Sequence, residues 1–156
     1  MKNNNDLVKI LLNSDATDLK NEAGRQMLTQ KPSNYELVNI LKYLERRDFE
    51  SQKIIDLAAA ELRKSVGINE IVDEGALIKE IAEVVMKNPA SLKMLDWHCG
   101  TSHCIGGYAC ILNPIAKEVE VRFGTLIAAA AVLPNYVPLF FKDNEEALDV
   151  LKSVLK

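Results

Sequence analysis

Apolar residues recur every three or four positions along most of the chain, and this spacing restricts its fold more than any other feature. Residues three or four apart lie on one face of a helix, so each run predicts an amphipathic helix. The clearest runs are Leu19, Ala23 and Met27; Leu37, Leu41 and Leu44; and Ile55, Ala58, Ala59 and Leu62. Because only 7 Gly and 5 Pro interrupt 156 residues, we expect an all-α fold.

Residues that commonly cap helices stand before several of these runs. Ser33 precedes Glu36 by three positions, which is the spacing of a capping box. In that motif each side chain accepts a hydrogen bond from the main-chain amide of the other residue. Further helix starts are predicted at Asp48, Asp73 and Asp143.

Residues 113–123 leave two interpretations open. Asn113 followed by proline is typical of a helix start, because proline is favoured at the first helical position. However, Val119, Val121 and Phe123 alternate with polar residues, as they would in a strand. The sequence does not decide between these conformations.

The first half of the chain contains an internal repetition. NDLVKIL (5–11) matches YELVNIL (35–41) at a spacing of 30 residues, and EAGRQML (22–28) resembles LAAAELR (57–63) at a spacing of 35. Helical-hairpin repeats have periods in this range and bury their apolar faces by stacking on one another. The N-terminal half therefore resembles HEAT-like repeats. The alternative is two unrelated amphipathic helices that share this pattern by chance.

A joint between two parts of the chain is predicted in SVGINEIVDEG, residues 65–75, where Gly67 and Gly75 bracket a polar stretch. We expect a repeat-like segment of helical hairpins at 1–66. It would pack on a C-terminal helical unit at 67–156, either as two domains or as one continuous domain.

The charge balance argues against nucleic acid as a partner. The net charge is −3, and residues 1–66 carry eleven Lys and Arg against ten Asp and Glu. Residues 67–156 carry eight against twelve. A surface that binds phosphates needs an excess of basic residues, which neither half has.

Two further patterns predict a cytoplasmic protein without a membrane segment. The longest uncharged apolar run, residues 123–133, has about half of the roughly 20 residues that a membrane span needs. The first fifteen residues do not form a signal peptide, because Asp6 and Lys9 break their apolar run. We therefore expect the three Cys to be free thiols in a reducing compartment rather than a disulfide framework.

The stretch DWHCGTSHCIGGYAC, residues 96–110, contains both His, all three Cys and the single Trp of the chain. The ligand types of a tetrahedral zinc site are present there as His98, Cys99, His103 and Cys104. Structural zinc sites draw their ligands from separated arms, whereas these four residues form two adjacent pairs. A further ligand, such as Asp96, would be needed. Zinc is thus one candidate, and the cofactor is otherwise unknown from the sequence.

A reactive thiol is a second interpretation. Thr101 or Ser102 would cap a helix running to about residue 112, which puts Cys104 in its first turn. The helix dipole and the nearby imidazoles would lower the pKa of that thiol. Cys99 is close enough in sequence to form a reversible disulfide with Cys104. No orienting Asn or Asp is identified, so no catalytic residues are assigned.

A packed corner is the third interpretation and the one that we favour. Free Cys residues mostly behave as small buried hydrophobes, as Cys104 and Cys110 would here. Trp97 would anchor the corner, and the imidazoles would bond main-chain carbonyls. Inside a helix, each of Gly106 and Gly107 lowers stability by about 1 kcal/mol relative to Ala. We therefore expect a neighbour directly against the backbone there, most simply the Ala-rich helix at 128–131.

An anion site is a fourth interpretation, because main-chain amides at a helix start bind anions. Such a nest would be formed by Gly100, Thr101 and Ser102, beside Trp97. The same residues make up the packed corner.

WHCGTSHCIGGYA, followed by GTLIAAAAVL and then by LFF and NEEAL, resembles a pattern that recurs in small bacterial, cyanobacterial and phage proteins. Those proteins share a Cys-Gly-Thr, a second Cys and a helix with small, Gly, aromatic and Ala residues. The resemblance covers residues 92–150, and here Gly106–Gly107–Tyr108 replaces a common Ala-Gly-Trp. No function is assigned to that family, so the resemblance implies no activity, substrate or ligand.

These observations favour a non-enzymatic protein-interaction module. We expect a protein partner, with a second copy of this chain as another possible partner, and neither nucleic acid nor a membrane. The alternative function is a metal-binding, redox or nucleophilic thiol site in the His/Cys stretch.

Overall fold

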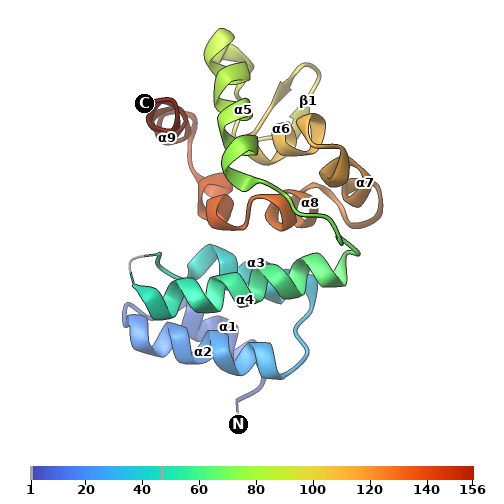
Figure 1. Ribbon diagram of the computed structural model, residues 1–156. Coiled ribbons are helices and arrows are strands. Elements are labelled where there is room, and N and C mark those ends of the chain that lie inside the picture. Colours follow the sequence, from blue (N-terminus) through green and yellow to red (C-terminus); the bar gives the residue numbers. More distant parts are fainter. Residues whose placement is uncertain (1, 47) are drawn as a thin grey trace. The chain divides into compact units, whose positions relative to one another are not determined.

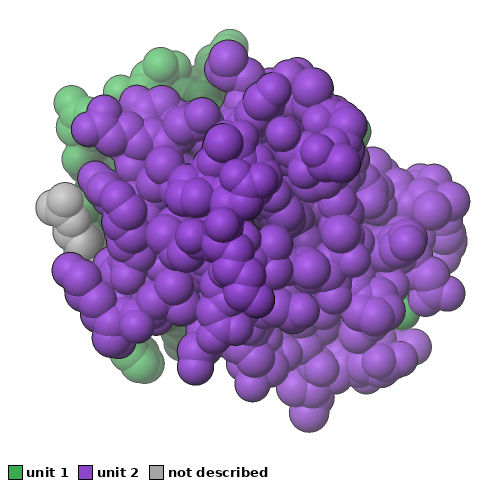
Figure 2. Space-filling model, turned by 90° about the horizontal axis from the view of Figure 1, so that it is seen from above, with its two compact units in different colours: residues 1–67 green, residues 68–156 purple. Residues whose placement is uncertain are grey.

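The computed structural model describes residues 2–46 and 48–156 and has an all-α fold, as the sequence predicts. The chain divides into two compact units, residues 1–67 and residues 68–156, which Figure 2 shows in green and purple. The division follows Gly67, inside the segment from which the joint was expected. Among the described helices, none combines the length and the apolar composition that crossing a bilayer requires.

Unit 1, residues 1–67, consists of two helical hairpins. Its helices are α1 (Asn4–Asn13), α2 (Thr17–Thr29), α3 (Asn34–Tyr43) and α4 (Phe49–Ser65). Helix α1 packs against α2, and α3 packs against α4 (Figure 1). Because α1 also contacts α3 and α2 also contacts α4, the second hairpin stacks on the first. The core between them contains Leu7, Leu11, Met27, Leu37, Leu41, Ile54, Ile55 and Leu62.

The predicted helix starts of unit 1 are confirmed. The Glu36 amide donates to Ser33 Oγ at 3.2 Å, and the Ser33 amide donates to Glu36 Oε2 at 2.7 Å, which completes the capping box of α3. Asp48 caps α4 by accepting a hydrogen bond from the Ser51 amide. These contacts satisfy amides that a helix leaves unpaired in its first turn.

Of Leu19, Ala23 and Met27, which their spacing places along one side of α2, only the last two belong to the core. Ala23 and Met27 are buried, but Leu19 remains 57% exposed. A helix has 3.6 residues per turn, so positions four apart drift by about 40° per step around its axis. After two steps the drift has carried Leu19 off the face that α2 packs against its neighbours.

Unit 2, residues 68–156, consists of helices and one short hairpin. Its elements are α5 (Glu74–Lys87), η1 (Pro89–Ser91), β1 (His98–Cys99), β2 (Ser102–His103), α6 (Ile105–Leu112), α7 (Pro114–Phe123), α8 (Thr125–Val132), η2 (Pro134–Phe141) and α9 (Asn144–Val154). Helix α5 packs against α6 and α9, and α6 packs against α7 and α8. Every residue of α8 from Ala128 to Val132 is fully buried, so this helix lies in the core of the unit.

Residues 113–123, whose conformation the sequence left open, contain helix α7. The Ala116 amide donates to Asn113 Oδ1 at 3.0 Å, and this cap starts the helix. Ala116 and Val119 face the core, whereas Val121 is 86% exposed. The alternation of Val119, Val121 and Phe123 therefore does not reflect a strand.

Candidate functional site

The His/Cys stretch forms a small antiparallel hairpin in front of α6. Strands β1 and β2 pair His98 with His103 and Cys99 with Ser102. Gly100 lies in the turn with a φ of +60°, a conformation that glycine adopts without strain. The first cross-strand pair places the two imidazoles on the same face of the hairpin.

The two histidines contact each other and a glutamate that the sequence analysis missed. His98 Nδ1 lies 2.9 Å from His103 Nδ1, and His98 Nε2 lies 2.5 Å from Glu120 Oε1. The same glutamate oxygen accepts a hydrogen bond from Thr125 Oγ1 at 2.8 Å. Glu120 comes from α7, 22 residues beyond His98, and no local pattern in the sequence links the two. Its position one turn after the buried Ala116 is the only hint that it faces inward.

Burial and hydrogen bonding both shift pKa values in this cluster. Burial lowers the pKa of His103, which is only 8% exposed, and the neighbouring His98 lowers it further. Burial alone would raise the pKa of Glu120, but hydrogen bonds from His98 and Thr125 bring it below its usual value. Because the two Nδ1 atoms face each other, one ring must donate and the other accept. The contact therefore favours a cluster in which at least one imidazole is neutral.

Of the three cysteines, Cys110 interacts with this cluster, through the carboxylate of Glu120. Cys99 is exposed on the hairpin, whereas Cys104 and Cys110 are buried free thiols. Cys104 caps α6, where its Sγ accepts a hydrogen bond from the Gly107 amide at 3.3 Å. The predicted caps at Thr101 and Ser102 are therefore wrong, because Ser102 is taken up by the hairpin and α6 begins at Ile105.

The lowered pKa predicted for Cys104 is also wrong. Burial raises the pKa of this thiol, and the hydrogen bonds from main-chain amides at the start of α6 only partly oppose that effect. Burial also raises the pKa of Cys110 strongly. Since the thiolate is the reactive form, these buried thiols lack the environment of a nucleophile.

The geometry does not match the predicted zinc site at His98, Cys99, His103 and Cys104. The facing Nδ1 atoms of His98 and His103 form a hydrogen bond with each other. Cys99 is exposed on the hairpin, whereas Cys104 is buried at the start of α6. Within residues 2–46 and 48–156, no group of three or more His, Cys, Asp or Glu is placed to hold a metal ion.

The anion nest expected at Gly100, Thr101 and Ser102 is not formed at a helix start. These residues make the turn and the first position of β2, and α6 begins only at Ile105. The oriented amides of a helix N-terminus are therefore not presented by this segment.

Trp97 anchors a packed corner at this point, as the favoured interpretation predicts, but the two imidazoles contact each other and Glu120 rather than main-chain carbonyls. Its ring packs edge-to-face on Phe140, with centroids 6.3 Å apart. A Cβ at Gly106 would lie 2.6 Å from the Trp97 ring and 3.2 Å from Ala129 Cβ. A Cβ at Gly107 would lie only 1.9 Å from the Trp97 carbonyl oxygen. The nearest neighbour of both glycines is thus Trp97, and the Ala-rich helix that the sequence predicted there approaches only Gly106, through Ala129.

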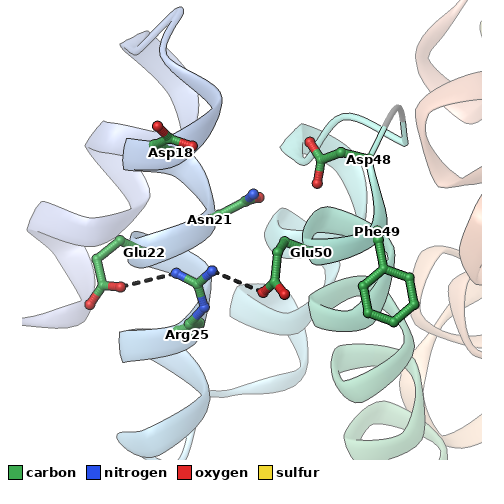
Figure 3. A pocket seen from close by; sticks show the side chains of 7 residues that line it. All are labelled: Asp18, Asn21, Glu22, Arg25, Asp48, Phe49 and Glu50. Atoms are coloured by element: carbon green, nitrogen blue, oxygen red, sulfur yellow. Dashed lines mark hydrogen bonds and ion pairs between the residues drawn. The ribbon is translucent and has the colours of Figure 1, made fainter.

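An open groove in unit 1 offers a different kind of site. It encloses about 710 Å³ between α2 and the start of α4 (Figure 3). Its lining residues are Asp18, Asn21, Glu22, Arg25, Asp48, Phe49 and Glu50. Helical spacing places the α2 residues on one face, but only the stacking of the two hairpins brings them opposite α4. The sequence analysis did not identify this groove for that reason.

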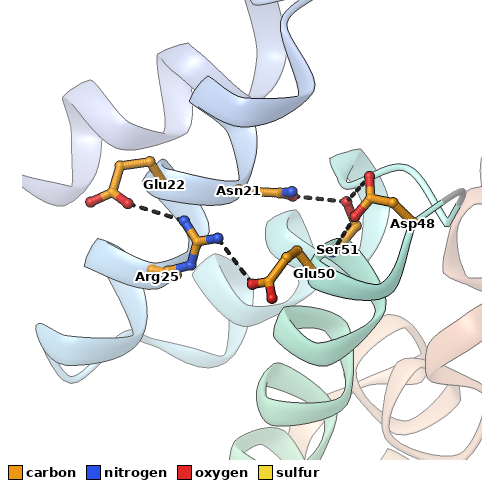
Figure 4. Close-up of polar contacts among 6 residues, drawn as sticks. All are labelled: Asn21, Glu22, Arg25, Asp48, Glu50 and Ser51. Atoms are coloured by element: carbon orange, nitrogen blue, oxygen red, sulfur yellow. Dashed lines mark hydrogen bonds and ion pairs between the residues drawn. The ribbon is translucent and has the colours of Figure 1, made fainter.

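Arg25 on α2 forms one ion pair within its own helix and one across the groove to α4 (Figure 4). The Arg25 guanidinium donates to Glu22 Oε2 at 3.1 Å and to Glu50 Oε2 at 3.2 Å. The hydrogen bond to Glu50 is the main reason that the pKa of Arg25 is raised. Hydrogen bonds from Gln26 and Arg25 lower the pKa of Glu22. The groove thus binds one guanidinium of its own and retains an excess of carboxylates.

A buried amide lies at the floor of the groove. Asn21 is only 4% exposed and points from α2 toward α4 (Figures 3 and 4). The Ser51 hydroxyl lies 2.9 Å from Asn21 Oδ1 and 3.1 Å from Asp48 Oδ2. It has a single proton and can donate fully to one of them at a time. No other described residue hydrogen-bonds to the Asn21 side chain, so its amide retains hydrogen-bonding capacity.

Exposed apolar side chains continue the groove along α4. Phe49 is 82% exposed at the rim, and Leu57, two turns further along, is 51% exposed. A second hollow of about 280 Å³ lies between them and includes Lys53 and Asp56 in its lining. An aromatic side chain held in solvent at the start of a helix leaves apolar area that a partner could cover.

Unit 2 has an apolar hollow as well. It encloses about 400 Å³ and is lined by Met94, Leu95, Trp97, Cys104, Phe140, Phe141, Lys142 and Asp143. Trp97 and Phe140 form part of its wall and also belong to the packed corner. Its two charged lining residues, Lys142 and Asp143, are consecutive in the chain.

No protein-family model, curated protein or solved structure matches this chain. The inference of a function therefore depends on the geometry of its own surfaces.

Proposed function

We propose that this chain is a non-enzymatic protein-interaction module, and that its binding surface is the groove between α2 and α4 with the adjoining face of α4. The observation that carries this proposal is the position of Phe49. Its ring is 82% exposed, yet it stands at the rim of a groove of about 710 Å³. Aromatic residues are enriched in protein interfaces, and burying one contributes substantially to binding.

The stacking of the two hairpins supports this role. We infer that they are HEAT-like repeats, because the repeated segments 5–11 and 35–41 lie in the equivalent helices α1 and α3. Leu7 and Leu37 are both buried, 30 residues apart, and so are Leu11 and Leu41. Stacked helical repeats leave an extended surface along successive helices, which such proteins use for binding. We also propose a cytoplasmic location, in keeping with three cysteines that are all free thiols.

A photo-crosslinking residue at position 49 tests the proposed function. p-Benzoylphenylalanine in place of Phe49 keeps an aromatic side chain there, and the same residue in place of Val121 is the matched control. Val121 is 86% exposed but lies on α7, in the other unit. In cells that express the chain naturally, we expect one protein, or a second copy of the chain, to crosslink at position 49 and not at position 121.

Binding of the crosslinked partner must then be reproduced with purified proteins. We expect Phe49→Ala to weaken that binding at least tenfold, because truncating a central aromatic contact typically costs about 2 kcal/mol or more. Crosslinks that are identical at both positions, or absent from position 49, would overturn the proposed function.

A further inference from the structure

We propose that the facing imidazoles of His98 and His103 form a pH-sensitive contact, and that the base of the β1–β2 hairpin opens when both rings carry a proton on Nδ1. The two Nδ1 atoms lie 2.9 Å apart, which is close enough to share one proton and too close to hold two. This inference is independent of the proposed function, because every group in the contact belongs to residues 68–156.

The hydrogen bonds around the pair determine where its protons lie at neutral pH. The pKa of Glu120 lies below its usual value, so its carboxylate is ionised and only accepts. His98 therefore donates to Glu120 from Nε2, and its Nδ1 accepts the proton that His103 carries on Nδ1. Both rings are neutral in this arrangement, and both contacts are hydrogen bonds.

One added proton leaves both hydrogen bonds in place. His98 then carries protons on both nitrogens and donates to Glu120 and to Nδ1 of His103, whose own proton lies on Nε2. The carboxylate of Glu120 balances the charge of His98. His103 remains neutral in this state, because burial lowers its pKa and the neighbouring His98 lowers it further.

A second added proton leaves no acceptor between the rings. Two N–H groups then point at each other across 2.9 Å, and two positive charges face each other. His103 cannot withdraw, because it is 8% exposed and its ring packs edge-to-face on Tyr108, with centroids 5.0 Å apart. The His98 side chain is 34% exposed and can turn toward the solvent. We therefore expect His98 to move and the two strands to separate at this pair.

The pair lies at the base of the hairpin, beside the apolar hollow of unit 2. Trp97 and Cys104, which directly flank the pair in sequence, both line this hollow of about 400 Å³. The Cys104 amide also donates to the Asp96 carbonyl at 3.1 Å, immediately beyond the pair. Separating the strands there breaks this bond and increases the exposure of Trp97 and Cys104.

The titratable groups around the pair leave only the imidazoles to change charge between about pH 6.5 and 4.5. Glu120 on α7 stays ionised in this range, because its pKa lies below 4.5. Cys104 and Cys110, at the start of α6 and within it, stay protonated, because burial raises the pKa of both thiols. A structural change in this range therefore reports on the two rings.

The other elements packed around the pair contribute hydroxyl groups. The Tyr108 ring on α6 faces His103, and its hydroxyl is hydrogen-bonded to η1. Thr125, at the start of α8, donates its hydroxyl to the carboxylate of α7. Lys93 and Asp96, in the segment that pairs with β2, have exposed side chains. The charges that act on His103 are therefore those of the second imidazole and of the carboxylate.

NMR of the full chain, labelled with ¹⁵N, tests this inference between pH 7.5 and 4.5. The imidazole nitrogens report the protonation of each ring, and hydrogen exchange of the Cys104 amide reports on the base of the hairpin. We expect the protection of that amide to fall about tenfold or more as the second ring becomes charged, while the amides of α4 in unit 1 keep theirs. The fluorescence of Trp97 should change over the same range, without loss of the helical circular dichroism signal.

Three variants separate the imidazole pair from other causes. His98→Gln removes one of the two charges and keeps a side chain that can accept from His103, so we expect the Cys104 amide to stay protected down to pH 4.5. Glu120→Gln still accepts from His98 but no longer favours charged rings, so we expect opening to shift to lower pH by about one unit. Glu118→Gln, at an exposed position of the same helix, is the matched control and should behave as the wild type.

Opening that persists in His98→Gln would overturn the inference, because a single charged ring would then be enough. Two charged rings in the wild type with an unchanged Cys104 amide would overturn it as well. If His98→Gln does not fold, Glu120→Gln decides. Opening at a lower pH supports the inference, whereas opening at an unchanged or higher pH, or a hairpin already open at pH 7.5, would show that the pair does not close the hairpin.

Discussion

Replacing Gly107 with alanine tests how closely the chain before the hairpin lies against α6. An added Cβ would lie 1.9 Å from the Trp97 carbonyl oxygen and 3.0 Å from the carbonyl carbon. Carbon and oxygen atoms in contact normally lie at least about 3.3 Å apart, so the oxygen would have to move by roughly 1.4 Å. Since that oxygen belongs to the main chain, no rotation of a side chain can relieve the contact.

The expected loss of stability follows from what this movement disrupts. Trp97 follows Asp96, whose carbonyl accepts a hydrogen bond from the Cys104 amide at 3.1 Å. The Lys93 amide donates to the His103 carbonyl at 2.9 Å in the same region. Losing two such bonds costs about 2 kcal/mol, and disturbing the packing of Trp97 costs about 1–2 kcal/mol more. Alanine gains about 1 kcal/mol over glycine inside a helix. We therefore expect a net loss of about 2–3 kcal/mol.

Urea unfolding followed by tryptophan fluorescence measures this loss, because Trp97 is the single Trp of the chain and reports on residues 68–156. Gly75→Ala is the matched control. Its Cβ would lie an ordinary 3.5 Å from Asp73 Oδ1, so we expect no loss and a gain of up to about 1 kcal/mol. A Gly107→Ala protein as stable as the wild type would refute the close approach of the Trp97 carbonyl.

Gly106→Ala supplies an internal comparison at the neighbouring position. Its Cβ would collide with the Trp97 ring at 2.6 Å, and a ring can move where a main-chain carbonyl cannot. Adding Trp97→Ala should therefore reduce the effect of Gly106→Ala but not that of Gly107→Ala. Thermal unfolding by circular dichroism checks this in variants without tryptophan, and equal relief at both positions would contradict the argument.

Three further outcomes are expected. Because burial lowers the pKa of His103 from 6.5, acidification protonates the unfolded chain before the folded one, so the free energy of unfolding should fall as the pH drops below about 6.5. Urea unfolding between pH 7.5 and 5.5 checks this, and a slope that persists unchanged in His103→Gln would contradict it. Cys99 is exposed while Cys104 and Cys110 are buried, so a thiol reagent should modify one thiol quickly and two only on unfolding. Two rapidly reacting thiols would show that the corner is open. Ser33→Ala should destabilise α3 by about 1 kcal/mol in circular dichroism melts, and no change would mean that the capping box contributes nothing.

Local signals in the sequence predicted the helices and many of their starts. A capping box joins residues three positions apart, as Ser33 and Glu36 are, so nothing outside that short segment is needed to form it. The same holds for the caps at Asp48, Asp73 and Asp143. The all-α class follows from the same periodicity, because the apolar spacing of a helix is set by its own geometry.

The predictions that failed concern burial. Cys104 stands at a helix start, where a thiolate is favoured, but it is enclosed by the unit, and the loss of water raises its pKa instead. Leu19 has the spacing of a core residue and lies outside the core. Neither outcome can be read from neighbours in sequence, because burial depends on which other segments cover a position.

The sequence by itself determined the helical class, the helix starts at Ser33, Asp48, Asp73 and Asp143, and the need for a close neighbour at Gly106–Gly107. Only the tertiary structure decided which side chains meet. It paired His98 with Glu120, 22 residues away, and set Arg25 between carboxylates of α2 and α4. The physical reason is the separation in sequence of the residues that interact. A helix forms through contacts within about four residues, whereas a site forms where separate helices pack. The order of the helices along the chain does not specify that packing.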